Sequence, residues 1–381
     1  MNSIHPTARA WAQIDLAAMT HNFNIAKSTG KKVMCVIKAN AYGHGAVPCG
    51  LHLQKLGADF FAVACLAEAV ELRNGGISKP ILILGYTPAE YATELAQHHI
   101  TQTVYDMDSA QALSTEALKA GVTIDVHIKV DTGMSRIGIY AQSVEAASAA
   151  AEEIQHIYAL PGLNVRGVYT HFSVADAPDQ DSYTKWQLGN YNAVLKALAD
   201  KGIHPEIRHA GNTAAIMNHP DSHFDMIRAG IMLYGMYPDG IHRDGPLKPV
   251  MTLKSRVAQI RELPAGASVS YGRTYETDKP TRIAVITAGY ADGHPRRISD
   301  NSYDIINGRS FPQIGRICMD MHMLDITGDN TVKAGDEVSL WGGEGMTAEQ
   351  VAERVGTLNY ELTCLITPRI ARVYLDDNTR L

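Results

Sequence analysis

The segment VIKANAYGHGA, residues 36–46, places one lysine directly after an apolar run and surrounds it with small residues. Lys38 ends the run VMCVI, and Tyr42 and His44 follow it closely. Apolar surroundings lower the pKa of an amine, because burial disfavours the charged ammonium form. A lysine of this kind is typical of nucleophiles and of Schiff-base chemistry with carbonyl compounds.

Short β-branched runs alternate with amphipathic or alanine-rich stretches from Val33 to about Gly235, as in parallel strands joined by helices. Helices are expected between the strands, for example at 66–75 and 143–157. Eight units predict a closed (β/α)8 TIM-type barrel, because a doubly wound open sheet normally has fewer strands and a glycine-rich first turn. The expected strands are 33–39, 59–65, 80–85, 101–106, 122–131, 163–172, 206–211 and 225–230.

Polar residues end several of these runs, where a barrel places its active site. Each of them alone is equally well explained as a satisfied structural group. Together they predict one site at the carboxyl ends of the strands. The residues are Lys38 after the first strand, Lys129 and Asp131 on the fifth, His171 on the sixth, Asn212 and Thr213 after the seventh, and Arg228 and Gly230 on the eighth.

Small residues follow the last two strands in the segments GNTAA and AGIMLYG. Free backbone N–H groups at such helix starts are the usual phosphate cradle of a barrel. A Schiff-base lysine that faces a phosphate site predicts pyridoxal 5'-phosphate as the cofactor. Tyr42 is expected to reach a phosphate oxygen.

The sequence pattern changes after Tyr237, where prolines and glycines are closely spaced. Strands are expected beyond this point at 251–266, 281–290 and 336–343. The sequence therefore predicts a barrel over residues 16–240 and a mostly β domain over residues 241–381.

The composition limits the kinds of binding partner that are expected for this protein. The chain of 381 residues has a formal net charge of -6 and lacks a long basic stretch, which excludes nucleic acid and anionic membranes as expected partners. No apolar run reaches membrane-spanning length, and the start does not resemble an export signal. Five scattered cysteines without a CxxC motif argue against disulfides or a metal site, so a cytoplasmic protein with a small ligand and no metal is expected.

At this point the sequence resembles the alanine racemase family, a group of fold-III pyridoxal-phosphate enzymes. The resemblance spans nearly the whole chain and rests on VIKANAYGHG, KVDTGMSRIG, THF, IRAGIMLYG, SYGRTY, GYADG, GRICMD and NYEL, in the family's order. It implies interconversion of L- and D-alanine, which supplies D-alanine for peptidoglycan. It also implies a head-to-tail homodimer with composite active sites, and a first strand, within residues 1–15, that belongs to the β domain.

The resemblance also implies roles for individual residues. Lys38 matches the lysine that bonds to the cofactor, and Tyr271 matches an opposing base donated by the other subunit, with His171 beside it. Two bases are needed because inversion removes a proton from one face of the α-carbon and returns it to the other. Arg228 matches the residue that faces the pyridine nitrogen. Because guanidinium keeps its proton, that nitrogen stays unprotonated, which favours racemisation over transamination.

The other implied positions surround the cofactor and the substrate. Arg136 and the N–H group of Met319 match the carboxylate site, and Lys129 matches a lysine that is often carbamylated to steady Arg136. An ion pair between Lys129 and Asp131 is the alternative. The phosphate ligands are Tyr42, Thr213, Gly230, Ile231 and Tyr360, Asn212 neighbours the cofactor, and Tyr290 and Asp320 line the access channel and the carboxylate region.

Two positions depart from the family pattern. Threonine replaces the commoner serine at Thr213 and keeps the hydroxyl group. His294 stands where an aromatic or aliphatic residue is common, which bears on the access channel. Cys318 is expected to be a packing residue rather than a nucleophile.

Three other functions stay open at the level of sequence. A serine or broad-specificity racemase of the same fold differs by only a few pocket atoms. A fold-III decarboxylase would be expected to pair the pyridine nitrogen with a carboxylate, whereas this sequence has Arg228. A cofactor-carrier relative lacks the β domain that contains Tyr271 and Met319.

Overall fold

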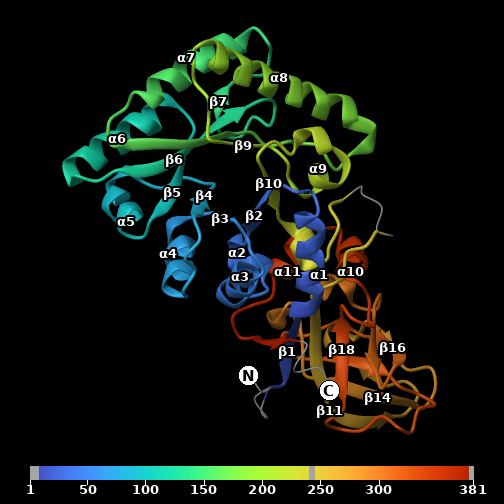
Figure 1. Ribbon diagram of the computed structural model, residues 1–381. Helices are drawn as coiled ribbons and strands as arrows, with labels where there is room; N and C mark the ends of the chain where they lie inside the picture. The colour runs from blue at the N-terminus through green and yellow to red at the C-terminus, as the bar shows by residue number, and fades with distance from the viewer. Residues whose placement is uncertain (1–7, 240–244, 377–381) are drawn as a thin grey trace.

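The computed structural model describes residues 8–239 and 245–376, and it has a parallel barrel at one end and a β domain at the other (Figure 1). The barrel strands are ordered β10-β2-β3-β4-β5-β6-β8-β9, and the neighbours along this path pair in parallel. They are β2 (Lys32–Val36), β3 (Phe60–Val63), β4 (Ile81–Ile83), β5 (Ile100–Val104), β6 (Ile124–Asp131), β8 (Leu163–Tyr169), β9 (Ile207–His209) and β10 (Met226–Ala229).

The barrel is nearly closed between its last two strands. The N–H group of Asp225 donates to the carbonyl of Arg208 at 3.1 Å, and that of Arg228 donates to the carbonyl of Gly211 at 2.9 Å. Each of the eight strands expected from the sequence overlaps one of the observed strands, so the predicted barrel is confirmed.

Helices connect the strands and cover the outside of the barrel (Figure 1). Local sequence sets their ends: in α6 (Met107–Ala120), Asp106 accepts a hydrogen bond from the Ser109 N–H group at the start, and Gly121 ends the helix at φ +67°. The expected helices at 66–75 and 143–157 correspond to α4 (Leu66–Asn74) and α7 (Ala146–Tyr158). The other barrel helices include α3 (Ala46–Lys55), α5 (Ala92–Gln97), α8 (Asp181–Asp200) and α9 (Thr213–Asn218).

The C-terminal sheet is mostly antiparallel, with the order β14-β17-β16-β15-β18-β11-β1-β19. The long strand β11 shifts register between Val257 and Gln259, and its second half also pairs with β14, so six strands form a ring. The N-terminal strand β1 (Ala10–Asp15) pairs with β11 and β19. The other strands are β11 (Met251–Leu263), β14 (Thr281–Ile286), β15 (Tyr303–Ile306), β16 (Arg309–Ile314), β17 (His322–Asp325), β18 (Glu337–Trp341) and β19 (Ala371–Leu375).

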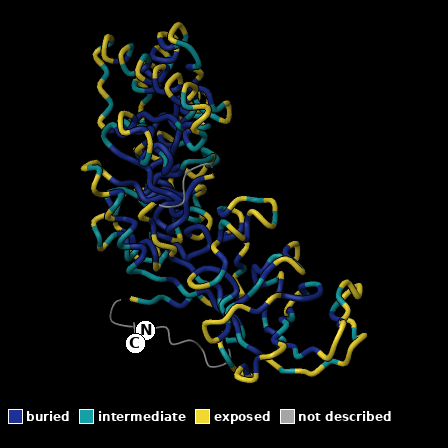
Figure 2. The backbone as a smooth tube through the Cα atoms, turned by 90° about the vertical axis from the view of Figure 1, so that its right-hand side faces the viewer, coloured by how far each residue is buried: buried dark blue, intermediate teal, exposed yellow. Residues whose placement is uncertain are grey.

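The apolar core runs from the barrel into the adjoining part of the β domain, as the buried tube in Figure 2 shows. One cluster joins the barrel strands to Leu253, Trp341 and Leu362, and a second fills the ring of six strands. The helix α1 (Leu16–Lys27) leads from β1 into the barrel. The boundary expected at residues 240–241 lies outside the described residues. Within 8–239 and 245–376, no helix has the length and apolar character that crossing a membrane requires.

Candidate active site

A cavity of about 740 Å³ lies at the carboxyl ends of the barrel strands, and this size suits a small cofactor together with its substrate. It brings together residues that are far apart in the sequence. Those named from the sequence that line it are Lys38, Tyr42, Lys129, Arg136, His171, Asn212, Thr213, Arg228, Gly230, Ile231 and Tyr360.

Lys38 begins a turn with unusual backbone geometry. The four residues from Ala39 to Tyr42 have φ angles between +52° and +54°, in the left-handed region. This conformation costs about 1–2 kcal/mol per residue for side chains other than glycine. The Glu68 carboxylate accepts the Ala39 N–H group at 2.7 Å and helps to hold the turn. Strain concentrated in this way is common where a functional side chain must be aimed.

The small residues after Lys38 allow the C-terminal segment to press against the turn. A Cβ atom on Gly43 would lie 2.1 Å from the carbonyl oxygen of Thr363, and one on Gly45 would lie 1.8 Å from the hydroxyl of Tyr374. That hydroxyl donates to the carbonyl of His44 at 3.0 Å. The two glycines are therefore required by close packing, and this packing fixes the position of the lysine.

The two cavity lysines both have lowered pKa values. Burial and then Arg136 lower the pKa of Lys38. Burial, Arg136 and Arg228 lower the pKa of Lys129 to about 8. The sequence therefore predicted the direction for Lys38 correctly, and a pKa of about 8 leaves a fraction of the Lys129 amine neutral near physiological pH.

Arg228 is buried at the base of the cavity, where acceptors surround the two terminal nitrogens of its guanidinium. Its Nη2 atom donates to the carbonyls of Thr170 and Ala210 at 2.9 and 2.8 Å and to Nδ1 of His171 at 2.9 Å. Its Nη1 atom donates to Nδ1 of His209 at 2.9 Å. Within the described residues, Nε donates no hydrogen bond. Burial lowers the pKa of Arg228 to about 10, so it stays charged at neutral pH.

This guanidinium determines the protonation of the histidines beside it. Because Arg228 can only donate, Nδ1 of His171 and Nδ1 of His209 must accept. His209 therefore carries its proton on Nε2 and donates to Nδ1 of His127 at 2.9 Å. The ring of Tyr169 stacks on His209 with 4.7 Å between centroids. Burial and Arg228 hold the pKa of His171 well below its usual range, and the same causes act on His209, so both rings are neutral.

Another part of the cavity wall forms a cradle of hydroxyl and backbone N–H groups. A Cβ atom on Gly230 would lie 3.3 Å from the Tyr42 hydroxyl and 3.8 Å from Oγ1 of Thr213. The Gly230 N–H group donates to that Oγ1 at 3.2 Å. Asn212 caps α9 by accepting the Ala215 N–H group at 3.0 Å. This donor set, without an acidic side chain among its members, suits a phosphate group.

Asp131 does not pair with Lys129, so that alternative from the sequence is wrong. The Asp131 carboxylate instead accepts the N–H groups of residues 133, 134 and 135 at 3.1, 2.9 and 3.0 Å, and the amide of Gln142 at 2.8 Å. It thereby shapes the loop that leads to Arg136. Within the described residues Arg136 forms no ion pair, and this leaves a cation at the cavity for an anionic ligand.

Four residues named from the sequence lie on the β domain and do not line this cavity. They are exposed: Tyr271 by 68%, Met319 by 51% and Tyr290 by 42%, and the Asp320 side chain by 50%. Two loops bring Tyr271 and Met319 toward one another. Ser270, at φ +65°, lies 3.3 Å through its hydroxyl from the sulfur of Cys318. These residues form one exposed face, which we call the β-domain face.

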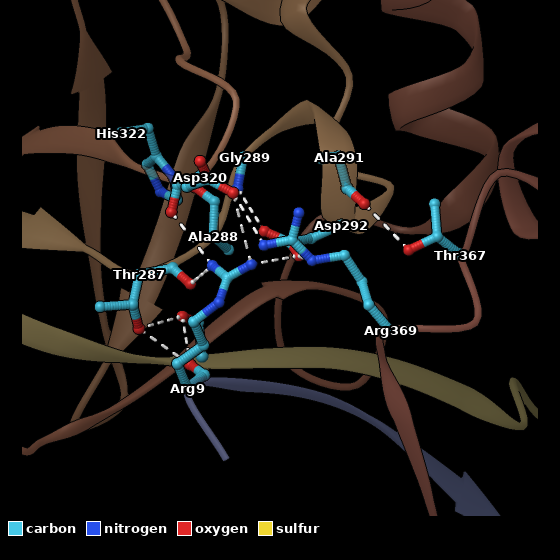
Figure 3. A network of polar contacts seen from close by, with 11 residues as sticks. Arg9, Thr287, Ala288, Gly289, Ala291, Asp292, Asp320, His322, Thr367 and Arg369 are labelled. Atoms are coloured by element: carbon cyan, nitrogen blue, oxygen red, sulfur yellow. Dashed lines mark hydrogen bonds and ion pairs between the residues drawn. The ribbon is translucent and has the colours of Figure 1, made fainter. Parts of the chain in front are cut away.

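A network of ion pairs supports the turn at residues 318–320 (Figure 3). Arg9 donates to the Asp292 carboxylate at 2.7 Å, and Arg369 donates to that of Asp320 at 2.7 Å. The Tyr290 N–H group donates to the Cys318 carbonyl at 3.1 Å. The Met319 N–H group donates no hydrogen bond within the described residues, so it stays available to a ligand.

Several cavity residues were not identified from the sequence, including Leu84, Tyr169, Asp176 and Cys364. Leu84 and Tyr169 lie near the ends of expected strands, so their positions could have indicated the cavity. They were not identified because only polar residues were considered there, and these two are apolar and aromatic. Asp176 and Cys364 come from outside the strands and carried none. His294 was expected to affect the access channel, which is wrong, because it is fully buried in the β domain.

A recessed lysine, a buried arginine and a phosphate-type cradle at the rim of a parallel barrel define a barrel enzyme with an appended β domain. Residues 14–238 match the family model described as alanine racemase, N-terminal domain, and residues 250–374 match alanine racemase, C-terminal domain. The chain belongs to the alanine racemase family, a family of isomerases.

Individual relatives are similar over nearly the whole chain. An alanine racemase of Desulfovibrio desulfuricans is 42% identical over 370 residues, which cover 96% of this chain and 98% of the relative. One of Clostridium perfringens is 44% identical over 375 residues, with coverage of 97% and 96%. The solved alanine racemase of Clostridium difficile 630 has a TM-score of 0.92 and 41% identity, with coverage of 98% and 97%.

Proposed function

We propose that this chain interconverts L-alanine and D-alanine with pyridoxal 5'-phosphate bound in the barrel cavity. The observation that carries the proposal is the arrangement of Lys38 and Arg228 in one cavity with the cradle around Gly230. These groups suit the aldehyde, the ring nitrogen and the phosphate of that cofactor. When bound, the cofactor withdraws electrons from the amino acid and so acidifies the α-proton.

The proposed cofactor site uses residues from several strand ends. Lys38 would hold the aldehyde carbon covalently, because a lowered pKa favours the neutral, nucleophilic form of its amine. Arg228 would face the ring nitrogen, and Asn212 would lie beside the cofactor. The phosphate would bind to Tyr42, Thr213, Gly230, Ile231 and Tyr360.

Arg228 would favour racemisation over other reactions of the α-carbon. Its pKa of about 10 keeps the guanidinium charged at neutral pH, so it cannot pass a proton to the ring nitrogen. The cofactor would then withdraw less negative charge from the α-carbon. This would favour the return of a proton to that carbon, which racemisation needs, over other reactions.

Two bases would act on opposite faces of the α-carbon. Lys38 is one of them, and Tyr271 of the partner subunit is the other. Tyrosine has an ordinary pKa of about 10, so its action as a base needs a nearby positive field. We propose that the neutral ring of His171 lies next to this phenol in a homodimer and offers it a hydrogen bond, and that the charged Arg228 behind His171 supplies the positive field.

The substrate carboxylate would bind where the cavity has a free cation. Arg136 supplies a guanidinium fork, and the free N–H group of Met319 from the partner subunit completes the site. Lys129, with a pKa of about 8, has enough neutral amine to be carbamylated, and the resulting anion would steady Arg136. Tyr290 and Asp320 would support this region. Tyr360 and Tyr271 would leave space for a methyl side chain.

We propose that the reaction occurs in the cytoplasm and supplies D-alanine for peptidoglycan, with neither nucleic acid nor membrane as a partner. The five cysteines are all free, which supports a reducing compartment. The net charge of -6 supports a small-molecule substrate over a polyanion.

The test incubates the full chain with pyridoxal phosphate and L-alanine and measures D-alanine by chiral chromatography. L-serine and L-lysine are tested in parallel. We expect alanine to give the highest kcat/KM. Faster turnover of serine would replace the proposal with a serine racemase, and release of carbon dioxide from a basic amino acid would replace it with a decarboxylase.

The variant Lys38→Ala tests the covalent role of the lysine. We expect it to lose the visible absorbance of the bound cofactor and roughly 10³-fold or more of kcat. The matched control is Lys55→Ala on the barrel helix α3, outside the cavity, which should retain both. An unchanged absorbance band in Lys38→Ala would show that another lysine bonds to the cofactor.

A further inference from the structure

Three metal-ligating side chains meet inside the β domain, outside the barrel cavity. His294 follows the short helix η6 (Tyr290–Asp292), Asp304 lies on β15, and His322 begins β17. One ligand atom from each lies within 4.8 Å of the other two. All three residues are fully buried, and the two histidine rings are 4.7 Å apart between centroids. We call these residues the His294 cluster.

Polar atoms of this cluster lack partners. Within the described residues, neither ring nitrogen of His294 has a hydrogen bond, and neither does Oδ1 of Asp304. A buried polar atom without a partner costs roughly 1–3 kcal/mol. Because these side chains converge on one point, a single ligand bound among them would satisfy one ring nitrogen of His294 and a carboxylate oxygen of Asp304 together.

His322 is oriented in the way that metal-binding histidines usually are. Its Nδ1 atom donates to the carbonyl of Ala288 at 2.8 Å (Figure 3), so the lone pair of the neutral ring is on Nε2. Metal ligands typically donate their other ring N–H group to a carbonyl or carboxylate in this manner. Nε2 lies 2.6 Å from Oδ2 of Asp304. That contact needs a shared proton, which a bound cation would replace and release to solvent.

We propose that His294, Asp304 and His322 bind a divalent transition metal of the zinc type. Two imidazole nitrogens and one carboxylate oxygen form a donor set that zinc uses, with a water as the fourth ligand. Magnesium and calcium prefer sites made entirely of oxygen. The ligand atoms lie up to 4.8 Å apart, and tetrahedral bonds of about 2.0–2.2 Å would draw them closer together through side-chain rotations.

The proposed metal would be structural. None of its ligands lines the barrel cavity. It would cross-link three segments of the β domain beside the turn at 318–320, since His322 follows Asp320 closely and His294 follows Tyr290 closely. The metal would therefore stiffen the β-domain face. The sequence predicted no metal because the cysteines lack the spacing of a metal site. The three ligands proposed here come from separate segments, so they form no local sequence motif.

The test measures metal content and thermal unfolding of the full chain, purified without chelator after growth with added zinc. We expect about one zinc per chain in the wild type and a higher Tm than after dialysis against a chelator. The variants His294→Leu and Asp304→Asn should contain no zinc and show no zinc-dependent shift in Tm. The matched control His156→Gln, exposed on α7, should behave as the wild type does.

Other results would overturn the proposal. Equal zinc content in the wild type and His294→Leu would place the metal elsewhere. A His294→Leu protein that unfolds above the wild type, with or without zinc, would show that removing an unpartnered histidine is simply favourable. If His294→Leu does not fold, cobalt added to the metal-free wild type decides, because a site of this type gives visible absorption bands and their absence rejects the site. These measurements do not depend on racemase activity.

Discussion

At the scale of single residues, the charge of Arg228 organises the base of the cavity. Its N–H groups donate to Nδ1 of His171 and Nδ1 of His209, so these atoms must accept. His209 in turn donates from Nε2, which makes Nδ1 of His127 an acceptor as well. Burial, together with this charge, lowers the pKa values of all three histidines and keeps them neutral. A lysine at position 228 has three donors on one atom and could not reproduce the planar set of contacts.

The buried histidines predict a dependence of stability on pH. Burial holds the pKa of His127 at about 3, below the value of about 6.5 in an unfolded chain. Below about pH 6.5 the unfolded chain therefore binds a proton that the folded protein does not. The free energy of unfolding should fall as pH decreases from about 6.5 toward 3, by up to about 1.4 kcal/mol per pH unit for this residue.

Urea unfolding of the variant His127→Gln between about pH 6 and about pH 4.5 measures this contribution. The slope of unfolding free energy against pH should be smaller than in the wild type by up to about 1.4 kcal/mol per pH unit. The exposed control His156→Gln should keep the wild-type slope. Identical slopes for all three proteins would mean that His127 titrates normally in the folded state.

At the scale of secondary-structure elements, the barrel strands have regular backbone conformations that the sequence pattern predicts, and the loops at their carboxyl ends do not. The strands are parallel and largely buried, whereas the turn after β2 has four consecutive residues in the left-handed region. Besides the Glu68 carboxylate, α11 (Asn359–Cys364) and β19 support that turn by packing against it through Thr363 and Tyr374. The lysine is thus positioned by a segment more than three hundred residues away.

The variant Gly45→Ala tests this packing. Its Cβ atom would collide with the Tyr374 hydroxyl, so we expect a loss of at least about 2 kcal/mol in unfolding free energy and weaker cofactor binding. Gly57→Ala is a matched control, because Gly57 also has a positive φ but nothing within 4 Å of the added atom. It should lose about 1 kcal/mol and bind the cofactor normally. Chemical denaturation and absorbance titration compare the two, and equal losses would contradict the packing argument.

At the scale of the whole molecule, one chain holds two halves of the proposed site in different places. The barrel cavity contains Lys38, whereas Tyr271 and Met319 lie exposed on the β-domain face. Figure 1 shows the barrel and the β domain at opposite ends of an elongated molecule. A head-to-tail pair would bring the β-domain face of one chain to the cavity of the other, and would do so twice by symmetry.

Mixed subunits test the composite site. Lys38→Ala and Tyr271→Phe are each expected to be nearly inactive. Denaturing the two variants together and refolding the mixture should restore up to roughly one quarter of wild-type activity, because a heterodimer contains one intact site. The control mixes each variant with itself and should recover nothing. No recovery in a mixture that forms heterodimers, as seen with two different affinity tags, would show that both bases come from the same chain.

The sequence alone determined the barrel, the β domain and the family, because apolar periodicity and short motifs are local properties that packing does not alter. It also indicated the lysine, the arginine and the small residues of the cradle, since each of them ends an apolar run. Only the tertiary structure decided what these residues contact: the acceptors around Arg228, the C-terminal segment against Gly43 and Gly45, the loop capped by Asp131, and the burial of His294. These depend on which distant segments approach one another, and a spacing pattern along one chain does not contain that information.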